Sequence, residues 1–155
     1  MCFRCRVDEC RKSIRLSNRS GIQVRRTYRT CFDTFLSVGT CSALGVSVYF
    51  QKENVKITQG TLKSYKLINE SGKEMDFQFC ATCGSTLLWD IELLLDLIGT
   101  SGGAHDPPTF WYSVDREVFQ RSKAEFVHID SPESYATSRL YDPIHTDDPR
   151  LKGGY

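Results

Sequence analysis

The sequence predicts a mainly β protein. Its apolar residues alternate with polar ones over short runs, and glycine, proline and asparagine separate these runs. Little of the chain shows the period expected of a helix. With 155 residues, the chain is long enough to bury one independent core. These observations indicate a single domain built from short strands.

The strand pattern is clearest after residue 44, where each short run ends at a turn signal. In the first run, Val46, Val48 and Phe50 share one face because side chains alternate along a strand. Turns are expected at Gln59–Gly60 and at 69–73. The strands predicted in chain order are 45–50, 55–58, 61–67, 75–79, 85–89, 110–114 and 125–129.

The N-terminal 40 residues fit this pattern poorly. Residues 1–13 are basic and rich in cysteine, whereas 14–40 hold five arginines, one acid and no regular period, so no element is assigned to them. Segment 14–40 is interpreted either as a flexible basic loop or as sequence foreign to the domain, such as a translated non-coding insert. We expect a domain over 1–130, with 14–40 as an atypical insertion, and an extended tail over 131–155.

Charge and hydropathy exclude several classes of function. The formal net charge of +1 gives no reason to expect a nucleic-acid or membrane-surface partner. The strongest apolar run, 91–98, is far shorter than the ~20 residues of a membrane-spanning helix. Residues 1–6 carry cysteines and arginines where a signal peptide would be apolar. We therefore expect a cytoplasmic protein without a membrane partner.

Seven cysteines are many for such a chain, and in a reducing compartment clustered cysteines favour metal binding. Cys80 and Cys83 have two-residue spacing, and Gly84 tolerates the positive φ that follows such a knuckle. The flanking strands would place this pair at the tip of a hairpin. Zinc takes four ligands, so the site needs two more. The candidates for these two are Cys2, Cys5 and Cys10, near the cationic Arg6, Arg11 and Lys12.

Other interpretations of these residues remain open. Cys80 and Cys83 are also compatible with a redox dithiol or with two ordinary buried cysteines. Cys31 and Cys41 are predicted to be ordinary thiols. His128 is predicted to be a strand-surface or hydrogen-bonded histidine rather than a ligand.

The segment 79–87, Phe-Cys-Ala-Thr-Cys-Gly-Ser-Thr-Leu, resembles the central signature of the glutathione-dependent formaldehyde-activating family, which includes the centromere protein V domain. Residues 10–13, 55–60, 71–72, 110–115 and 128–129 resemble other parts of the family in the same order. The resemblance implies a β-tent fold of small twisted antiparallel sheets that holds one or two zinc ions.

The resemblance also implies roles for particular residues. Cys80 and Cys83 match the family's structural zinc knuckle, Cys10 matches the last cysteine of a second cluster, and Cys5 is its expected companion. The implied activity is that of a carbon–sulfur lyase which joins glutathione to formaldehyde as S-hydroxymethylglutathione. Arg11 or Lys12 is a candidate to attract a glutathione carboxylate, with solvated surface charge as the alternative. The resemblance identifies no catalytic side chain.

The sequence departs from the family at its N-terminus. Val7 stands where the second cluster would carry a cysteine, and the family's early C-x-C pair has no counterpart. Alternatives to the synthase activity are therefore a non-catalytic zinc-stabilised binding module of the same fold and a lyase acting on another thiol or small electrophile.

Overall fold

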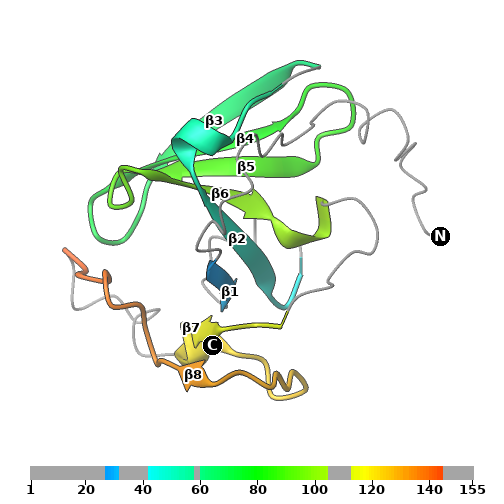
Figure 1. The fold of residues 1–155 in the computed structure, drawn as a ribbon. Coiled ribbons are helices and arrows are strands. Elements are labelled where there is room, and N and C mark those ends of the chain that lie inside the picture. The colour runs from blue at the N-terminus through cyan, green and yellow to red at the C-terminus, as the bar shows by residue number, and fades with distance from the viewer. Residues whose placement is uncertain (1–26, 32–41, 58–59, 105–112, 145–155) are drawn as a thin grey trace.

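The protein is described from a computed structural model, which places residues 27–31, 42–57, 60–104 and 113–144 (Figure 1). Eight strands form one sheet in the order β3-β4-β5-β6-β2-β1-β7-β8. The pairs from β3 across to β1 are antiparallel, and β1–β7 and β7–β8 are parallel. The strands are β1 (Thr27–Cys31), β2 (Gly45–Gln51), β3 (Leu62–Ile68), β4 (Glu74–Cys80), β5 (Thr86–Ile91), β6 (Leu97–Ser101), β7 (Arg116–Val118) and β8 (Glu133–Ser134).

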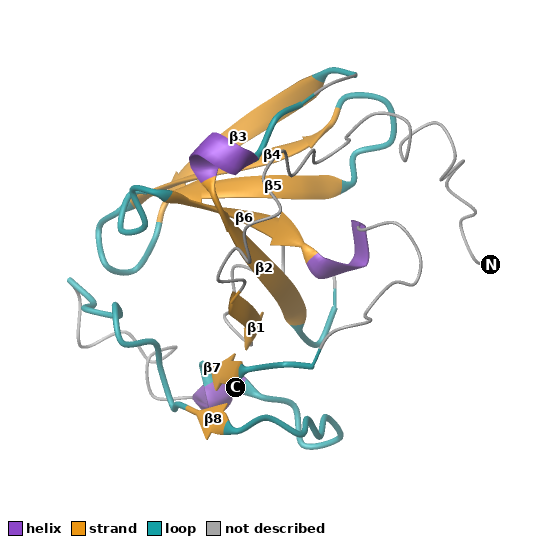
Figure 2. Cartoon of the chain, viewed as in Figure 1, coloured by secondary structure: helices purple, strands orange, loops and turns teal. Residues whose placement is uncertain are grey.

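The prediction of a mainly β fold is confirmed. The described residues contain no α-helix, only the short 3₁₀ turns η1 (Lys52–Asn54), η2 (Gly102–Ala104) and η3 (Gln120–Ser122) (Figure 2). Strands β2 to β5 lie within one or two residues of the predicted runs 45–50, 61–67, 75–79 and 85–89. The strands join into one continuous sheet rather than several small ones.

Two predicted strands are wrong where the structure describes them. Residues 55–57 follow the turn η1 and belong to no strand, and residue 58 lies outside the described residues. Segment 125–129 is a turn and a loop, because the Val127 amide bonds back to the Ala124 carbonyl and Phe126 and His128 face solvent. In the predicted strand 110–114, only 113–114 are described, and they form no strand.

Four strands were not predicted. β1 lies within segment 14–40, to which no element was assigned, yet it pairs with β2 and β7 and so connects the two parts of the sheet. β6 lies between β2 and β5, whereas β7 and β8 are too short to show an alternating pattern.

The core lies on one face of β4 and β5, where the sheet curls so that β7 packs against it. Met75, Phe77, Trp89 and Val118 form this buried cluster. The Trp89 indole lies across β6, and a Cβ added at Gly99 would stand 2.0 Å from its Nε1 atom. Glycine at position 99 is therefore a packing requirement of the core.

A buried carboxylate supports the β7–β8 end of the sheet. Glu117 is 2% exposed and accepts hydrogen bonds from Lys123 Nζ at 2.8 Å, Gln120 Nε2 at 2.7 Å and Ser134 Oγ at 2.9 Å. Burial by itself would raise the pKa of Glu117, but these bonds outweigh burial and lower its pKa overall. The carboxylate is thus held ionised between β7, η3 and β8.

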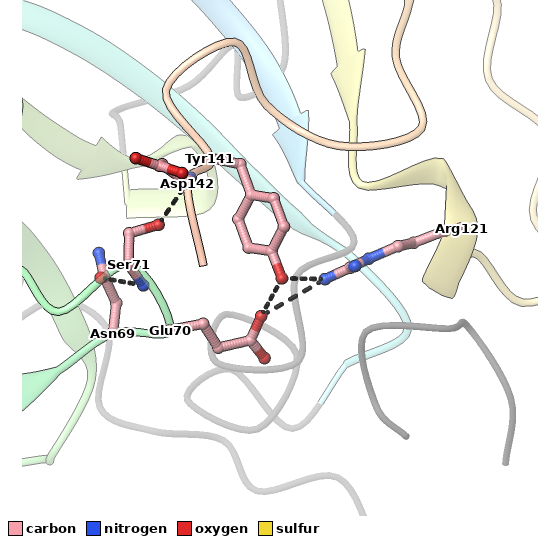
Figure 3. A network of polar contacts seen from close by, with 6 residues as sticks. All are labelled: Asn69, Glu70, Ser71, Arg121, Tyr141 and Asp142. Carbon is pink, nitrogen blue, oxygen red and sulfur yellow. Dashed lines mark hydrogen bonds and ion pairs between the residues drawn. The ribbon is translucent and has the colours of Figure 1, made fainter. Parts of the chain in front are cut away.

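The segment after β8 returns to the β3–β4 turn through a clamp formed by Glu70, Arg121 and Tyr141 (Figure 3). The Tyr141 hydroxyl donates to Glu70 Oε2 at 2.6 Å and accepts from Arg121 at 2.9 Å, and Arg121 lies 3.4 Å from Glu70 Oε2. Two backbone amides extend the contact, Asp142 to Ser71 Oγ and Ile144 to the Glu70 carbonyl, each at 3.0 Å. The clamp connects the two ends of the sheet across the core face.

Candidate metal centre

Cys80 and Cys83 lie at the tip of the β4–β5 hairpin, as the sequence pattern predicts. Cys80 is the last residue of β4, and its amide bonds to the Ser85 carbonyl at 2.9 Å. The Gly84 amide closes the turn on the Cys80 carbonyl, also at 2.9 Å. Gly84 has φ +75°, a conformation that side-chain-bearing residues rarely adopt. Residues 80–84 therefore form a tight knuckle whose shape depends on this glycine.

Hydrogen bonds within the knuckle hold both sulfur atoms. The Thr82 amide donates to Cys80 Sγ at 3.4 Å, and the Cys83 thiol donates to Ser85 Oγ at 3.2 Å. Hydrogen bonds from N–H and O–H groups to cysteine sulfurs are contacts that orient metal-binding sulfurs. The Ser85 hydroxyl can rotate to donate instead once Cys83 is ionised. The pair thus has the donor type and local polarity of one half of a zinc site.

The knuckle is buried on one side and open on the other. Cys80 is 3% exposed, whereas Cys83 is half-buried and Ala81, Thr82 and Gly84 face solvent. The Ala81 amide bonds to the Thr61 carbonyl at 3.0 Å, which fixes the knuckle to the start of β3. Further ligands would therefore reach the sulfurs from the Cys83 side.

The other predicted ligands, Cys2, Cys5 and Cys10, lie outside the described residues, as do Arg11 and Lys12. Among the residues that are placed, no group of three or more histidine, cysteine or acidic side chains is positioned to hold a metal. His128 is exposed in a loop.

Sequence reasoning did not assign roles to Thr82 and Ser85, which contact the two sulfurs. Their roles depend on the folded turn, since Thr82 acts through its backbone and Ser85 through a rotamer that reaches back two residues. The order Cys-x-x-Cys-Gly-Ser was the available signal for Ser85, because a hydroxyl two residues after a ligand lies within reach of its sulfur.

Fold and site together define a mainly β domain with a C-x-x-C knuckle at a hairpin tip. A sequence model of the family described as glutathione-dependent formaldehyde-activating enzyme matches residues 28–122. This match covers more than half of the chain, includes the knuckle and begins after Cys2, Cys5 and Cys10. The chain belongs to the glutathione-dependent formaldehyde-activating enzyme family. A comparison with curated proteins found no match.

None of the helical segments in the described part of the chain has the length and hydropathy needed to cross a membrane.

Proposed function

We propose that the protein is a zinc-dependent carbon–sulfur lyase that joins the thiol of glutathione to formaldehyde, giving S-hydroxymethylglutathione. The family match supports the reaction class. The observation that carries the metal requirement is the Cys80–Cys83 knuckle, whose sulfurs lie beside the Thr82 amide and the Ser85 hydroxyl.

The addition is balanced without an external reagent. The thiol sulfur forms a bond to the aldehyde carbon, and the carbonyl π electrons move to oxygen. That oxygen takes up the proton which the thiol releases. The reaction needs a thiolate close to neutral pH and a site that brings it to a small aldehyde.

In this proposal Cys80, Cys83 and the N-terminal cysteines Cys2, Cys5 and Cys10 are metal ligands rather than nucleophiles. A zinc ion held by four of these sulfurs would be closed and structural, whereas one held by three would keep a fourth position, at which its Lewis acidity would lower the pKa of a coordinated thiol. The Thr82 amide and the Ser85 hydroxyl restrain the two knuckle sulfurs and offset their negative charge. Arg11 or Lys12 is proposed to attract a glutathione carboxylate.

The first test is native mass spectrometry of protein purified without added metal, followed by initial rates of adduct formation. We expect bound zinc, a rate above the uncatalysed reaction, and loss of zinc in Cys83→Ser. Cys41→Ser serves as the matched control, because Cys41 is predicted to be an ordinary thiol, and it should retain the wild-type zinc content.

Three outcomes would contradict the proposal in different ways. Absence of zinc in wild-type protein would remove the metal requirement. Zinc-loaded protein that does not accelerate the addition would leave a non-catalytic, zinc-stabilised module of the same fold. Acceleration with other thiols but not with glutathione would instead indicate a lyase for a different substrate.

A further inference from the structure

Among the residues that the structure describes, strand β3 forms a long open edge of the sheet. It pairs with β4 and lies at the end of the strand order, at the top of the sheet in Figure 1. Five of its seven residues are exposed, and Tyr65 and Ile68 are 64% and 61% exposed. An edge strand of this length presents unpaired backbone groups that can template another strand.

The hydrogen bonds at both ends of β3 show which of its backbone groups point outward. The Asn69 amide bonds to the Lys73 carbonyl at 2.9 Å, and the Ala81 amide bonds to the Thr61 carbonyl at 3.0 Å. Hydrogen-bonded pairs alternate in an antiparallel ladder, so the odd-numbered residues of β3 bond to β4. The residues whose backbone groups point away from the sheet are Leu62, Ser64, Lys66 and Ile68.

We propose that β3 pairs antiparallel with β3 of a second copy of this chain, about a two-fold axis at Tyr65. This register overlaps all seven residues, and the outward-pointing groups face one another, Leu62 with the partner's Ile68 and Ser64 with the partner's Lys66. About eight backbone hydrogen bonds result, because each hydrogen-bonded pair exchanges two. The contact is isologous, which is the usual symmetry of a dimer.

The side chains favour this register over those centred at position 63 or 66. Lysines on an edge strand usually prevent pairing. Centring the axis at position 63 or 66 would oppose Lys63 or Lys66 to its own copy, and like charges directly opposite are unfavourable. Centring the axis at Tyr65 places Lys63 opposite the partner's Leu67 and brings the two Tyr65 rings together. Lys66 is already paired with Glu74 at 2.7 Å, so its charge is compensated within each copy.

The first test is sedimentation velocity over a series of protein concentrations. A single strand pair buries less than a standard interface, so we expect a dissociation constant on the order of 10–100 μM. Ser64→Pro removes one outward amide and leaves the bonds to β4, so it should weaken dimerisation at least about tenfold. Ser64→Thr keeps the amide and should dimerise like wild type.

A cysteine at the axis tests the register itself. The two copies of position 65 form a non-hydrogen-bonded pair with Cα atoms about 4.5 Å apart, within the range that a disulfide spans. Mild oxidation of Tyr65→Cys should give a covalent dimer whose link maps to position 65 by peptide mass spectrometry. Ser64→Cys faces the partner's Lys66 and should not exceed the wild-type background from native cysteines.

The proposal is overturned by a wild-type protein that stays monomeric throughout the concentration series, or by a dimer that Ser64→Pro leaves unchanged. Equal crosslinking of Tyr65→Cys and Ser64→Cys would overturn the register. A monomer that instead binds an extended peptide along β3 would assign the edge to a different partner. These outcomes are separate from the zinc and activity measurements, because β3 carries none of the proposed ligands.

Discussion

The two end strands of the sheet, β8 and β3, differ in their length and in what surrounds them. β8 has two residues, and the Glu117 network supports it while the returning C-terminal segment crosses from it to the β3–β4 turn. β3 has seven residues and presents most of them to solvent. One end strand is short and is supported by a buried network, and the other is long and carries lysines.

Similar ion pairs contribute differently to stability at the two ends of the sheet. Lys66 lies 2.7 Å from Glu74 on β3–β4, and Lys123 lies 2.8 Å from Glu117 beside β8. The side chains of the first pair are 59% and 48% exposed, and those of the second are 20% and 2% exposed. A solvent-exposed ion pair contributes little to stability. Breaking a buried pair is destabilising, because it leaves one charge buried without its partner. Burial therefore decides which pair matters.

The largest effect is expected at Gly99, because β6 lies between the two ends and supports the core that both share. Gly99→Ala would place a Cβ 2.0 Å from Trp89 Nε1, and the indole belongs to the buried core. We expect a loss of at least about 3 kcal/mol in unfolding free energy, measured by urea denaturation. Gly72→Ala is the control, since its Cβ meets Ile144 at 3.4 Å and its φ of +70° should cost about 1 kcal/mol. Equal losses in both variants would contradict the packing role of Gly99.

Glu117→Gln should destabilise the β7–β8 end of the sheet specifically. The glutamine amide carries no charge to compensate Lys123. Its NH₂ group is a hydrogen-bond donor and would lie against groups that also donate, Lys123 Nζ and Gln120 Nε2. Since Lys123 keeps some solvent contact, we expect a loss of about 2–3 kcal/mol in unfolding free energy. Glu125→Gln, at an exposed position, should change it by less than about 0.5 kcal/mol. A Glu117→Gln variant as stable as Glu125→Gln would show that the buried network is dispensable.

Acid should erase the difference between wild type and Glu117→Gln. Hydrogen bonding lowers the pKa of Glu117 in the folded protein below its ordinary value of 4.5 despite burial. The unfolded state then binds more protons near that value, so the stabilisation is complete above pH 4.5 and is lost as pH falls through the folded pKa. Urea denaturation of both proteins between pH 7 and pH 3 should show the gap narrowing below about pH 4.5. A gap that stays constant would mean that folding does not lower the pKa of Glu117.

Tyr141→Phe should loosen the clamp while leaving both sheet ends folded. The variant keeps the ring, which packs edge-on against Phe119 at 5.3 Å, and loses the hydroxyl shared by Glu70 and Arg121. We expect a loss of about 1–2 kcal/mol in unfolding free energy, with faster hydrogen exchange at the amides of Asp142 and Ile144. Burial and Glu70 raise the pKa of Tyr141, so its contribution should hold below pH 10 and disappear above the raised value. Tyr65→Phe, on the exposed edge, is the matched control and should leave exchange at these amides unchanged.

The sequence predicts β2 to β5 because their residues alternate and turn residues separate them. It does not predict β6, because Gly99 weakens the strand pattern and the reason for that glycine, Trp89, lies on another strand. β1 was missed because its arginine-rich surroundings show no period, although the sheet pairs it on both sides. Glu117 reads as a surface charge in the sequence, and only the convergence of β7, β8 and η3 makes it a buried one. Tertiary pairing determined each of these features.

The candidate metal site likewise has a part that the sequence specifies and a part that it does not. Cys80 and Cys83 are recognisable because a C-x-x-C-G turn is local, and the fold places them at a hairpin tip as predicted. Ligands from Cys2, Cys5 and Cys10 would join the knuckle across about 70 residues of sequence. Spacing alone cannot specify such a closure, so these three remain predictions.

The smallest effect is expected from the pair on the open edge. In the wild type, the bond from Lys66 to Glu74 raises the pKa of Lys66, and Lys66→Ala removes this bond. Both side chains are exposed, so they stay hydrated whether or not they pair. The Tm of dilute, monomeric protein should not change measurably, and added salt should have no greater effect on the variant than on wild type. The same substitution has a different consequence at high concentration, because an exposed edge without its lysine loses part of its protection against pairing in unwanted registers. We therefore expect Lys66→Ala to broaden the sedimentation profile at concentrations where wild type forms a defined dimer. A clear drop in Tm would show that this exposed pair is as important as the buried one, and the contrast between the two ends would fail.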